Sequence, residues 1–421
     1  MRVLFAVSAW SGLYRSTVPL GWALQAAGHQ VRFVCHASEV DTLAGAGVTP
    51  VALTDGWTMS FAGRLRNYLD AVGGTWPFTE LPPHPITGEP MRDLREFDFH
   101  AFMSGERPRL EKVLADSADA VVEFARSWRP DLVVHDLLSL EGLLTAKVLG
   151  VPALAHPWGP LGTDERDAEA AMMPADFSGA FARYGIGAMS FDHVDYFIDP
   201  NPPALAPPTR AMRLPVRYIP YNGPGVTPDW VLDEPAKPRV CVVWGNSVTT
   251  MFGPGSWVVP DVLAALATLD CEIVVTLNRA DFAAMRGQLG DLAELVRLVE
   301  NVPVHLFWES CAVVVHHGGG NAVLNGAIAG VPQLAITNGH DQHLIGQRLA
   351  DSGAGLRILG HEANRDNLRA AAARLLGESS FREQAQKLRT EMRAAPSPTQ
   401  LVATLEEIAG RSAGPRGDAD R

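Results

Sequence analysis

The sequence predicts an α/β protein made of two similar parallel-sheet domains that face each other across a cleft. Short apolar runs alternate with helical segments, motifs of the first half recur in the second, and a proline-rich stretch separates the halves. The chain has 421 residues, of which 47% are hydrophobic and 19% are charged. Each half is therefore long enough to bury its own core.

The N-terminal segment shows the alternation of strand and helix. Residues 3–7 form an apolar run, a polar loop follows, and Ser16 or Thr17 can cap a helix with Pro19 in its first turn. Residues 31–35 predict the next strand. A strand, a helix and a second strand in this order form the βαβ unit from which parallel sheets are built.

The same unit recurs once in each half. Val-Val-His-Asp at residues 133–136 parallels Val-Val-His-His at 314–317, and Gly-Val-Pro follows in both halves before another short strand. Two motifs that repeat in the same order indicate that the two halves of the chain have similar structures. Because ligands bind at the carboxyl ends of strands in open parallel sheets, we expect Asp136 and His317 at one shared cleft.

A proline-rich stretch over residues 199–238 places the domain boundary, because proline prevents helix and stiffens a linker. A new strand is expected at 239–244. The predicted divisions are an N-terminal domain at 1–205, a linker at 206–238, a C-terminal domain at 239–395, a C-terminal helix at 396–410 and a disordered tail at 411–421.

The amino-acid composition limits the kinds of molecule that the protein is expected to bind. The formal net charge of −12 disfavours nucleic acid or an anionic membrane, because both reward clustered basic charge. The sequence has no apolar run of about 18 residues and no signal-peptide pattern. The four cysteines are far apart and predict buried free thiols in a reducing cytoplasm. We therefore expect a cytoplasmic enzyme that acts on small molecules.

Three common active-site motifs are absent. No GxGxxG lies between a strand and a helix, no Gly-Lys pair marks a P-loop, and no GxSxG marks a nucleophile elbow. These absences disfavour dehydrogenases, nucleoside triphosphatases and hydrolases.

The most informative motif is HHGGGNA at residues 316–322, between a predicted strand and a predicted helix. Glycines at a helix start leave backbone N–H groups free, and the helix dipole adds partial positive charge. These features predict a diphosphate site that needs no basic side chain. The alternative is a glycine-rich turn beside two incidental histidines. A metal site is disfavoured because adjacent strand side chains point to opposite faces.

A second polar motif, Asp341-Gln342, lies in the loop after the following strand. A carboxylate and an amide side by side can hold vicinal hydroxyl groups, since one accepts hydrogen bonds and the other both donates and accepts. The alternative is a solvated loop or a helix cap.

Taken with these motifs, the block at 313–355, with its HHGGGNAVLNGAIAGVPQLAITNGHDQ run, resembles the donor-site signature of nucleotide-sugar glycosyltransferases with two Rossmann-like domains, the GT-B fold. The opening MRVLF…VPLGWALQAAGHQV, the stretch PDLVVHD…LGVPALAH and residues 217–223 are similar to the actinobacterial branch that attaches deoxysugars to polyketides and related natural products. The resemblance covers nearly the whole chain.

This resemblance implies an inverting transfer of a deoxysugar from a dTDP-sugar to a polyketide-like or aromatic aglycone, by O- or C-glycosylation, with no metal and no cofactor beyond the dTDP-sugar. It also implies that the C-terminal helix packs back on the N-terminal domain. A homodimer and an auxiliary cytochrome-like activator, which some relatives need, are left open.

The resemblance places the donor in the C-terminal domain, with His317 at the diphosphate and Asp341-Gln342 at the sugar hydroxyls. Ala322 stands where the family commonly has a serine or threonine, and Asn325 where an acidic ribose-binding residue is frequent. The full implied donor set is Gly245, Asn246, Ser247, Val302, His317, Gly318, Gly319, Gly320, Asn321, Ala322, Asn325, Asp341 and Gln342.

The catalytic histidine that many members carry in the first loop is replaced here by Leu13. Asp136 is our leading substitute, because it stands at a strand end facing the expected cleft; capping of the next helix is nearly as good an explanation. His156 is the second candidate, although a structural role is the commoner one for such a residue. Since a phenol is acidic and needs less help from a base, the loss favours an aromatic acceptor as a hypothesis.

The aromatic-rich segment from residue 55 to 103 is predicted to be irregular and to cover the acceptor. The alternative is that its aromatic residues cover the N-terminal core. The predicted acceptor-binding residues are Trp10, Leu13, Tyr14, Trp57, Phe61 and Trp76.

Two rival functions remain open at the level of sequence. A catalytically silent homologue that binds aglycone or helps a partner transferase would explain Leu13 and Ala322, but it has no need of His317 or the Asp341-Gln342 pair. A sugar-nucleotide epimerase would be expected to surround the donor with carboxylates.

Overall fold

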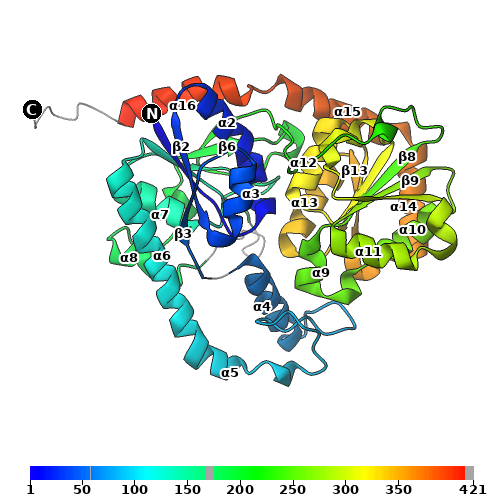
Figure 1. Ribbon diagram of the computed structural model, residues 1–421, viewed down its shortest axis with the longest axis horizontal. Coiled ribbons are helices and arrows are strands. Elements are labelled where there is room, and N and C mark those ends of the chain that lie inside the picture. Colours follow the sequence, from blue (N-terminus) through cyan, green and yellow to red (C-terminus); the bar gives the residue numbers. More distant parts are fainter. Residues whose placement is uncertain (57, 167–174, 413–421) are drawn as a thin grey trace, which may run out of the picture.

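The computed structural model describes residues 1–56, 58–166 and 175–412, and these form two parallel sheets, one in each half of the chain (Figure 1). Trp57 and most of the tail predicted at 411–421 lie outside the described residues. The N-terminal sheet has the order β3-β2-β1-β4-β5-β6-β7, and the C-terminal sheet has the order β10-β9-β8-β11-β12-β13.

The strands of the described part are short and follow the apolar runs of the sequence. In the N-terminal sheet they are β1 (Arg2–Ala6), β2 (Gln30–His36), β3 (Pro50–Thr54), β4 (Leu132–His135), β5 (Ala153–Ala155), β6 (Tyr196–Asp199) and β7 (Met212–Pro215). In the C-terminal sheet they are β8 (Arg239–Val243), β9 (Glu272–Leu277), β10 (Val296–Glu300), β11 (Val313–His316), β12 (Gln333–Thr337) and β13 (Gly355–Leu359).

The helices of the described part lie between these strands and after the last one. The first half contains α1 (Ser11–Tyr14), α2 (Val18–Ala26), α3 (Val40–Gly45), α4 (Met59–Val72), α5 (Phe99–Ala101), α6 (Arg107–Trp128), α7 (Leu140–Leu149) and α8 (Ala180–Arg183). The second half contains α9 (Asn246–Phe252), α10 (Val259–Leu266), α11 (Arg279–Gln288), α12 (Gly320–Ala329), α13 (His340–Asp351), α14 (Arg365–Gly377), α15 (Ser379–Ala394) and α16 (Pro398–Ser412).

Both sheets reverse their strand order at the same place. In the N-terminal sheet β1 pairs with β2 on one side and with β4 on the other, and in the C-terminal sheet β8 pairs with β9 and β11. Loops that leave neighbouring strands in opposite directions open a crevice at this point. The two echoed motifs belong to β4 and β11, which occupy equivalent positions in their sheets.

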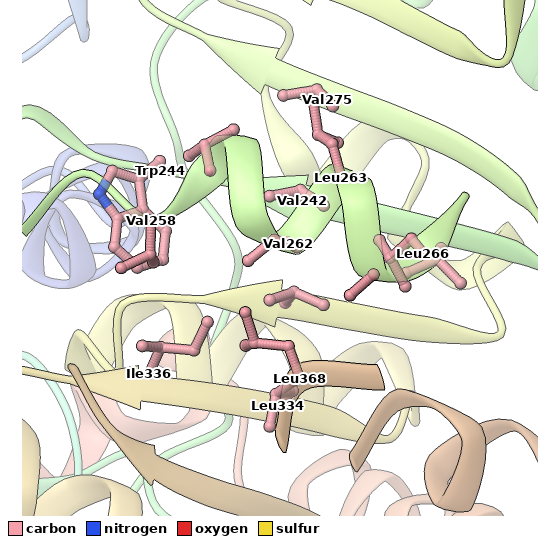
Figure 2. Packing of buried hydrophobic residues seen from close by; sticks show 14 of the residues in the cluster. Val242, Trp244, Val258, Val262, Leu263, Leu266, Val275, Leu334, Ile336 and Leu368 are labelled. Carbon is pink, nitrogen blue, oxygen red and sulfur yellow. The ribbon is translucent and has the colours of Figure 1, made fainter. Parts of the chain in front are cut away.

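Both faces of the C-terminal sheet are covered. On one face, Val242 and Val275 of the sheet pack against Val262 and Leu263 of α10, with Leu368 of α14 beside them (Figure 2). Side chains alternate between faces along a strand, so the neighbours Cys241 and Val274 enter a separate cluster. Burial on both faces explains why the strands are apolar throughout.

The last helix, α16, returns to the N-terminal half and lies alongside α2 (Figure 1). Leu401, Leu405 and Ile408 of α16 are buried in the same cluster as Val3 and Phe5 of β1. The helix therefore completes one face of the N-terminal core.

The proline-rich stretch differs from the prediction at its start. Strand β7 pairs with β6 through Phe197 and Arg213, so the N-terminal sheet continues past residue 205 into the expected linker. Proline is tolerated here because β7 is the edge strand and needs few backbone donors.

The segment predicted to be irregular contains the regular helix α4. Leu65 and Tyr68 on α4 are buried against Phe97 and Phe102 from the far side of the following loop. This local cluster stabilises the helix where the sequence pattern suggested only a loop. Among the described residues, the structure contains no helix with the length and apolar character needed to cross a membrane.

Candidate active site

A cavity of about 1280 Å³ lies between the two sheets. The N-terminal half contributes the loops after β1, β2 and β3, one face of α4 and the start of α7 to its wall. The C-terminal half contributes the loops after β8, β9, β10, β11 and β12. This is the shared cleft that the paired sheets predicted.

His317 reaches the cavity while the adjacent His316 does not. His316 is fully buried, and its Nε2 lies 3.0 Å from Oε1 of Gln333. His317 lines the cavity, and its buried Nδ1 has no hydrogen-bond partner within the described chain. Burial lowers the pKa of His317 to about 4, so the ring is neutral at pH 7, with one nitrogen as donor and one as acceptor.

Two glycines leave room for the His317 ring. A Cβ at Gly319 would lie 2.6 Å from Nε2 of His317, and a Cβ at Gly245 would lie 3.1 Å from its Cε1. Gly318 has a φ of +80°, which a residue with a side chain rarely adopts. It does not line the cavity, and its role is to turn the chain from β11 into the helix.

Helix α12 begins at this turn with its backbone donors uncapped. Gly319 is the N-cap and supplies no side-chain hydrogen bond, while Gly320, Asn321 and Ala322 line the cavity. Free N–H groups and the positive end of the helix dipole together favour an anion. The Nδ2 of Asn321 donates to the carbonyl of Gly12, which fixes the first N-terminal loop against the helix start.

Asp341 and Gln342 lie in the first turn of α13 and both line the cavity. Oε1 of Gln342 accepts from the backbone N–H of Asn338 at 3.0 Å and from that of Gly339 at 3.4 Å. The amide is thus oriented by its own helix cap, which leaves its N–H₂ group for a ligand. Burial raises the pKa of the Asp341 carboxyl.

Of the other predicted donor residues, some line the cavity and Asn325 does not. Gly245, Ser247 and Val302 line the cavity, and Asn246 begins α9. Asn325 is 2% exposed and does not line the cavity, and its Nδ2 donates to Oη of Tyr218 at 2.9 Å. Its implied ribose contact is therefore not supported by the structure, because its side chain is used to hold the linker segment against α12.

The two side chains predicted as the base do not line the cavity. Asp136 is fully buried, and its carboxylate accepts from the N–H and hydroxyl of Ser8 at 2.6 and 2.7 Å and from the backbone N–H groups of Leu138 and Ser139 at 2.9 and 3.0 Å. His156 is 2% exposed, and burial lowers its pKa to about 4. The prediction that one of these groups takes the proton directly is therefore corrected, because neither side chain lines the space where an acceptor would bind.

Trp10 and Leu13 line the cavity as predicted, but three other aromatic residues of the acceptor set do not. Tyr14 is 1% exposed and donates from its Oη to Oε2 of Glu39 at 2.6 Å. The predicted acceptor residue Phe61 packs near Phe102, with ring centroids 5.7 Å apart. The cavity wall formed by α4 comes from Met59, Ala62, Gly63, Arg66 and Asn67 instead.

Trp76, the third of these, belongs to the N-terminal half but packs against a residue of the C-terminal half. Its ring lies parallel to that of Phe252 on α9, with centroids 6.0 Å apart and an interplanar angle of 9°. Phe252 itself lines the cavity. Trp76 therefore supports the wall from behind.

Comparison with known proteins identifies the family. The N-terminal domain model of the erythromycin biosynthesis protein CIII-like family matches residues 22–245, and its C-terminal domain model matches residues 260–408. The chain belongs to the EryCIII-like family. It is accordingly a nucleotide-sugar-dependent glycosyltransferase of the actinobacterial natural-product branch, which confirms the resemblance and the fold of two Rossmann-like domains.

Individual relatives are similar over their whole length. The 10-deoxymethynolide desosaminyltransferase of Streptomyces venezuelae is 31% identical, with 100% of each chain covered. The aklavinone 7-beta-L-rhodosaminyltransferase of Streptomyces galilaeus is 31% identical, with 97% of this chain and 96% of that protein covered. The solved structure of the glycosyltransferase VinC in complex with dTDP has a TM-score of 0.72 and 29% identity, and it covers 98% of this chain and 100% of its own.

The sequence analysis missed several charged residues that line this cavity, among them Arg15 and Glu141. Arg15 follows the first strand, and its Nη1 donates to the carbonyl of Asn222 at 3.4 Å while its guanidinium lines the cavity. Glu141 lies in the first turn of α7 and also lines the cavity. Both follow sheet strands that end at the cleft, and that position was the signal available in the sequence.

Metal binding has no evident site in the described part of this EryCIII-like chain. Across residues 1–56, 58–166 and 175–412, no group of three or more histidine, cysteine, aspartate or glutamate side chains is placed to hold a metal ion.

Proposed function

We propose that this chain transfers a deoxysugar, with inversion, from a dTDP-sugar to a polyketide-like or aromatic aglycone and forms an O- or C-glycosidic bond. The observation that carries the proposal is the cavity wall of the C-terminal half, where His317, the uncapped start of α12 and Asp341-Gln342 face one space. The names of relatives support the sugar and aglycone classes, and the dTDP complex of VinC supports the nucleotide.

The donor would bind with its diphosphate at the start of α12. A neutral His317 would donate one hydrogen bond to a phosphate oxygen, and the free N–H groups of Gly320 and Asn321 would add others without a formal positive charge. Ala322 lacks the hydroxyl that the family commonly supplies, so this chain depends more on backbone donors. Asp341 and Gln342 would hold the hydroxyl groups of the sugar.

The acceptor would enter from the N-terminal half. That wall includes the apolar side chains of Trp10, Leu13, Met59, Leu140 and Leu144. Their flat and branched surfaces suit a large apolar aglycone. An acceptor on this side faces the sugar from the side opposite the diphosphate, and this is the arrangement that inversion requires.

The helper-protein alternative is not favoured. Relatives that match over the whole length are named transferases. Asp341 and Gln342, which we propose to hold the sugar hydroxyls, line the cavity here. A homodimer and a cytochrome-like activator are not part of the proposal.

The proposal is tested by a transfer assay with a panel of dTDP-deoxysugars against macrolactone and anthracyclinone aglycones, read by mass spectrometry. The expected result is a product heavier by one deoxysugar, and nuclear magnetic resonance of its anomeric centre should show inversion relative to the donor. Retention of configuration would contradict the inverting mechanism. Binding of dTDP without product from any pair would favour the helper protein.

A further inference from the structure

The first N-terminal loop presents the apolar side chain of Leu13 where a base is expected, and the carboxyl groups of the same half are the candidates for that role. Four carboxylates of the N-terminal half line the cavity, namely Glu39, Asp55, Glu141 and Asp176. They stand across the cavity from the donor wall, on the side proposed for the acceptor.

Three of these carboxylates are engaged or exposed. Glu39 accepts from Oη of Tyr14 at 2.6 Å. Asp176 accepts from the hydroxyl of Ser178 and from the backbone N–H of Phe181 at 3.1 Å, which fixes it as a local turn cap. Asp55 keeps 77% of its side chain exposed to solvent. None of the three is a free carboxylate in an apolar wall.

Glu141 differs from all three. Among the residues that the structure describes, only its own backbone N–H reaches the carboxylate. Its neighbours Leu140 and Leu144 line the cavity, and Leu144 belongs to the buried cluster that contains Leu13. Glu141 is half-buried in the first turn of α7, where the positive end of the helix dipole favours its ionised form.

We propose that Glu141 is the general base of the transfer, an assignment that rests on the proposed function. Its carboxylate takes the proton of the acceptor hydroxyl or phenol as that oxygen forms a bond to C1 of the sugar. The bond from C1 to the diphosphate breaks at the same time, and its electron pair leaves with dTDP toward His317 and the start of α12.

The surroundings of Glu141 favour this role. Burial raises the pKa of the Glu141 carboxyl, and the nearby Asp136 and Asp176 add to the rise. A weaker acid has a stronger conjugate base, so the shift increases its ability to remove a proton. Asp136 accepts from Ser8 and from the backbone N–H of Leu138, and so it fixes the turn that precedes α7, the helix whose first turn carries Glu141.

The test is the variant Glu141→Gln, which keeps the size and polarity of the side chain but removes the base. For the acceptor that gives product in the panel, kcat/KM should fall roughly 10²- to 10⁴-fold. The acidic limb of its pH profile should disappear, and the affinity for dTDP should stay unchanged. Glu141→Asp should recover part of the loss. Glu123→Gln, on the exposed face of α6, is the matched control and should behave as wild type.

The outcomes separate the two proposals. If the wild type transfers sugar and Glu141→Gln does so at a similar rate, Glu141 is not the base while the proposed function stands. If the variant loses dTDP affinity in parallel with its rate, the role of Glu141 is structural. A wild type that transfers no sugar in the panel overturns both proposals.

Discussion

At the scale of single residues, the cavity wall that we propose as the donor site depends on geometry more than on formal charge. His317 is neutral because it is buried, and its orientation depends on the absence of side chains at two neighbouring glycines. The net charge of −12 is compatible with a diphosphate ligand, because the predicted anion contacts are backbone N–H groups at a helix start. Arg15 adds one guanidinium to the same cavity.

Gly319→Ala should therefore weaken dTDP binding without a change of charge. The new Cβ would lie 2.6 Å from Nε2 of His317, so the ring must move away from its position. Loss of one hydrogen bond to a charged group predicts an affinity roughly 10-fold lower or worse, measured by calorimetry. Gly287→Ala is the control, since a Cβ there meets open space. Equal affinity in Gly319→Ala would contradict this account of the ring.

Replacement of His156 should change the stability of the folded chain and should leave the transfer rate close to that of wild type. The folded chain holds its pKa at about 4 by burial, whereas an unfolded histidine titrates near 6.5. The unfolded state therefore binds more protons between these values, and the free energy of unfolding falls as pH drops through this window. From pH 7 to pH 5 the contribution of one such histidine is on the order of 1–2 kcal/mol.

Urea unfolding of wild type and His156→Asn at these two pH values measures that contribution. The variant should lose less stability on acidification than the wild type, and its transfer rate should be close to that of wild type. An equal loss of stability would show that His156 does not resist protonation in the folded chain.

At the scale of elements, the contact between α4 and α9 encloses the cavity from one side. Nδ2 of Asn67 on α4 donates to the carbonyl of Met251 on α9 at 2.7 Å, and Trp76 stacks on Phe252 nearby. Helix α4 lies beside α9 in Figure 1. Two segments distant in sequence thus form one wall.

Trp76→Ala should loosen this wall and weaken acceptor binding selectively. Loss of an aromatic pair worth roughly 0.5–1.5 kcal/mol predicts an acceptor KM about 2- to 10-fold higher. The affinity for dTDP should not change, because the proposed diphosphate contacts are at His317 and the start of α12, and these are not on α9, which carries Phe252. Leu69→Ala, at an exposed position of α4, is the control. An unchanged acceptor KM in Trp76→Ala would show that the stack does not shape the acceptor wall.

The elements were predictable to different degrees. Apolar runs placed β1, β2 and β8 nearly at their observed bounds, because most side chains along these strands are buried. Helix α4 was missed, because the partners of Leu65 and Tyr68 come from residues some thirty positions later. Strand β7 was missed because its proline is acceptable only on an edge, and the edge is a property of the whole sheet.

At the scale of the whole molecule, the cleft brings loops of both halves together. Gly159 of the N-terminal half lies so close to Gly320 that a Cβ on it would be 2.3 Å from the Cα of Gly320. Nη2 of Arg348 lies 2.6 Å from Oε2 of Glu165, and this ion pair joins α13 to the loop after β5. The donor loop and the acceptor loops therefore border one space.

Most residues predicted for the donor line the cavity, whereas fewer of those predicted for the acceptor do. The chain order of His317, the glycines and Asp341 fixes them to strand ends and helix starts, so a linear motif suffices. The direction of a side chain from a loop is decided by its partners. The carboxylate of Asp136 is hydrogen-bonded to Ser8 and does not line the cavity, whereas Glu141, in the first turn of α7, does.

Calorimetric titration with dTDP tests the central claim most directly, namely that the loops after β11 and β12 form a nucleotide-sugar site. The wild type should bind one dTDP per chain below millimolar concentration, and His317→Ala should bind it roughly 10- to 100-fold more weakly. His100→Ala, at an exposed position far from these loops in sequence, should bind as the wild type does. Absence of dTDP binding to the wild type at millimolar concentration, or equal affinity in His317→Ala, would contradict the account.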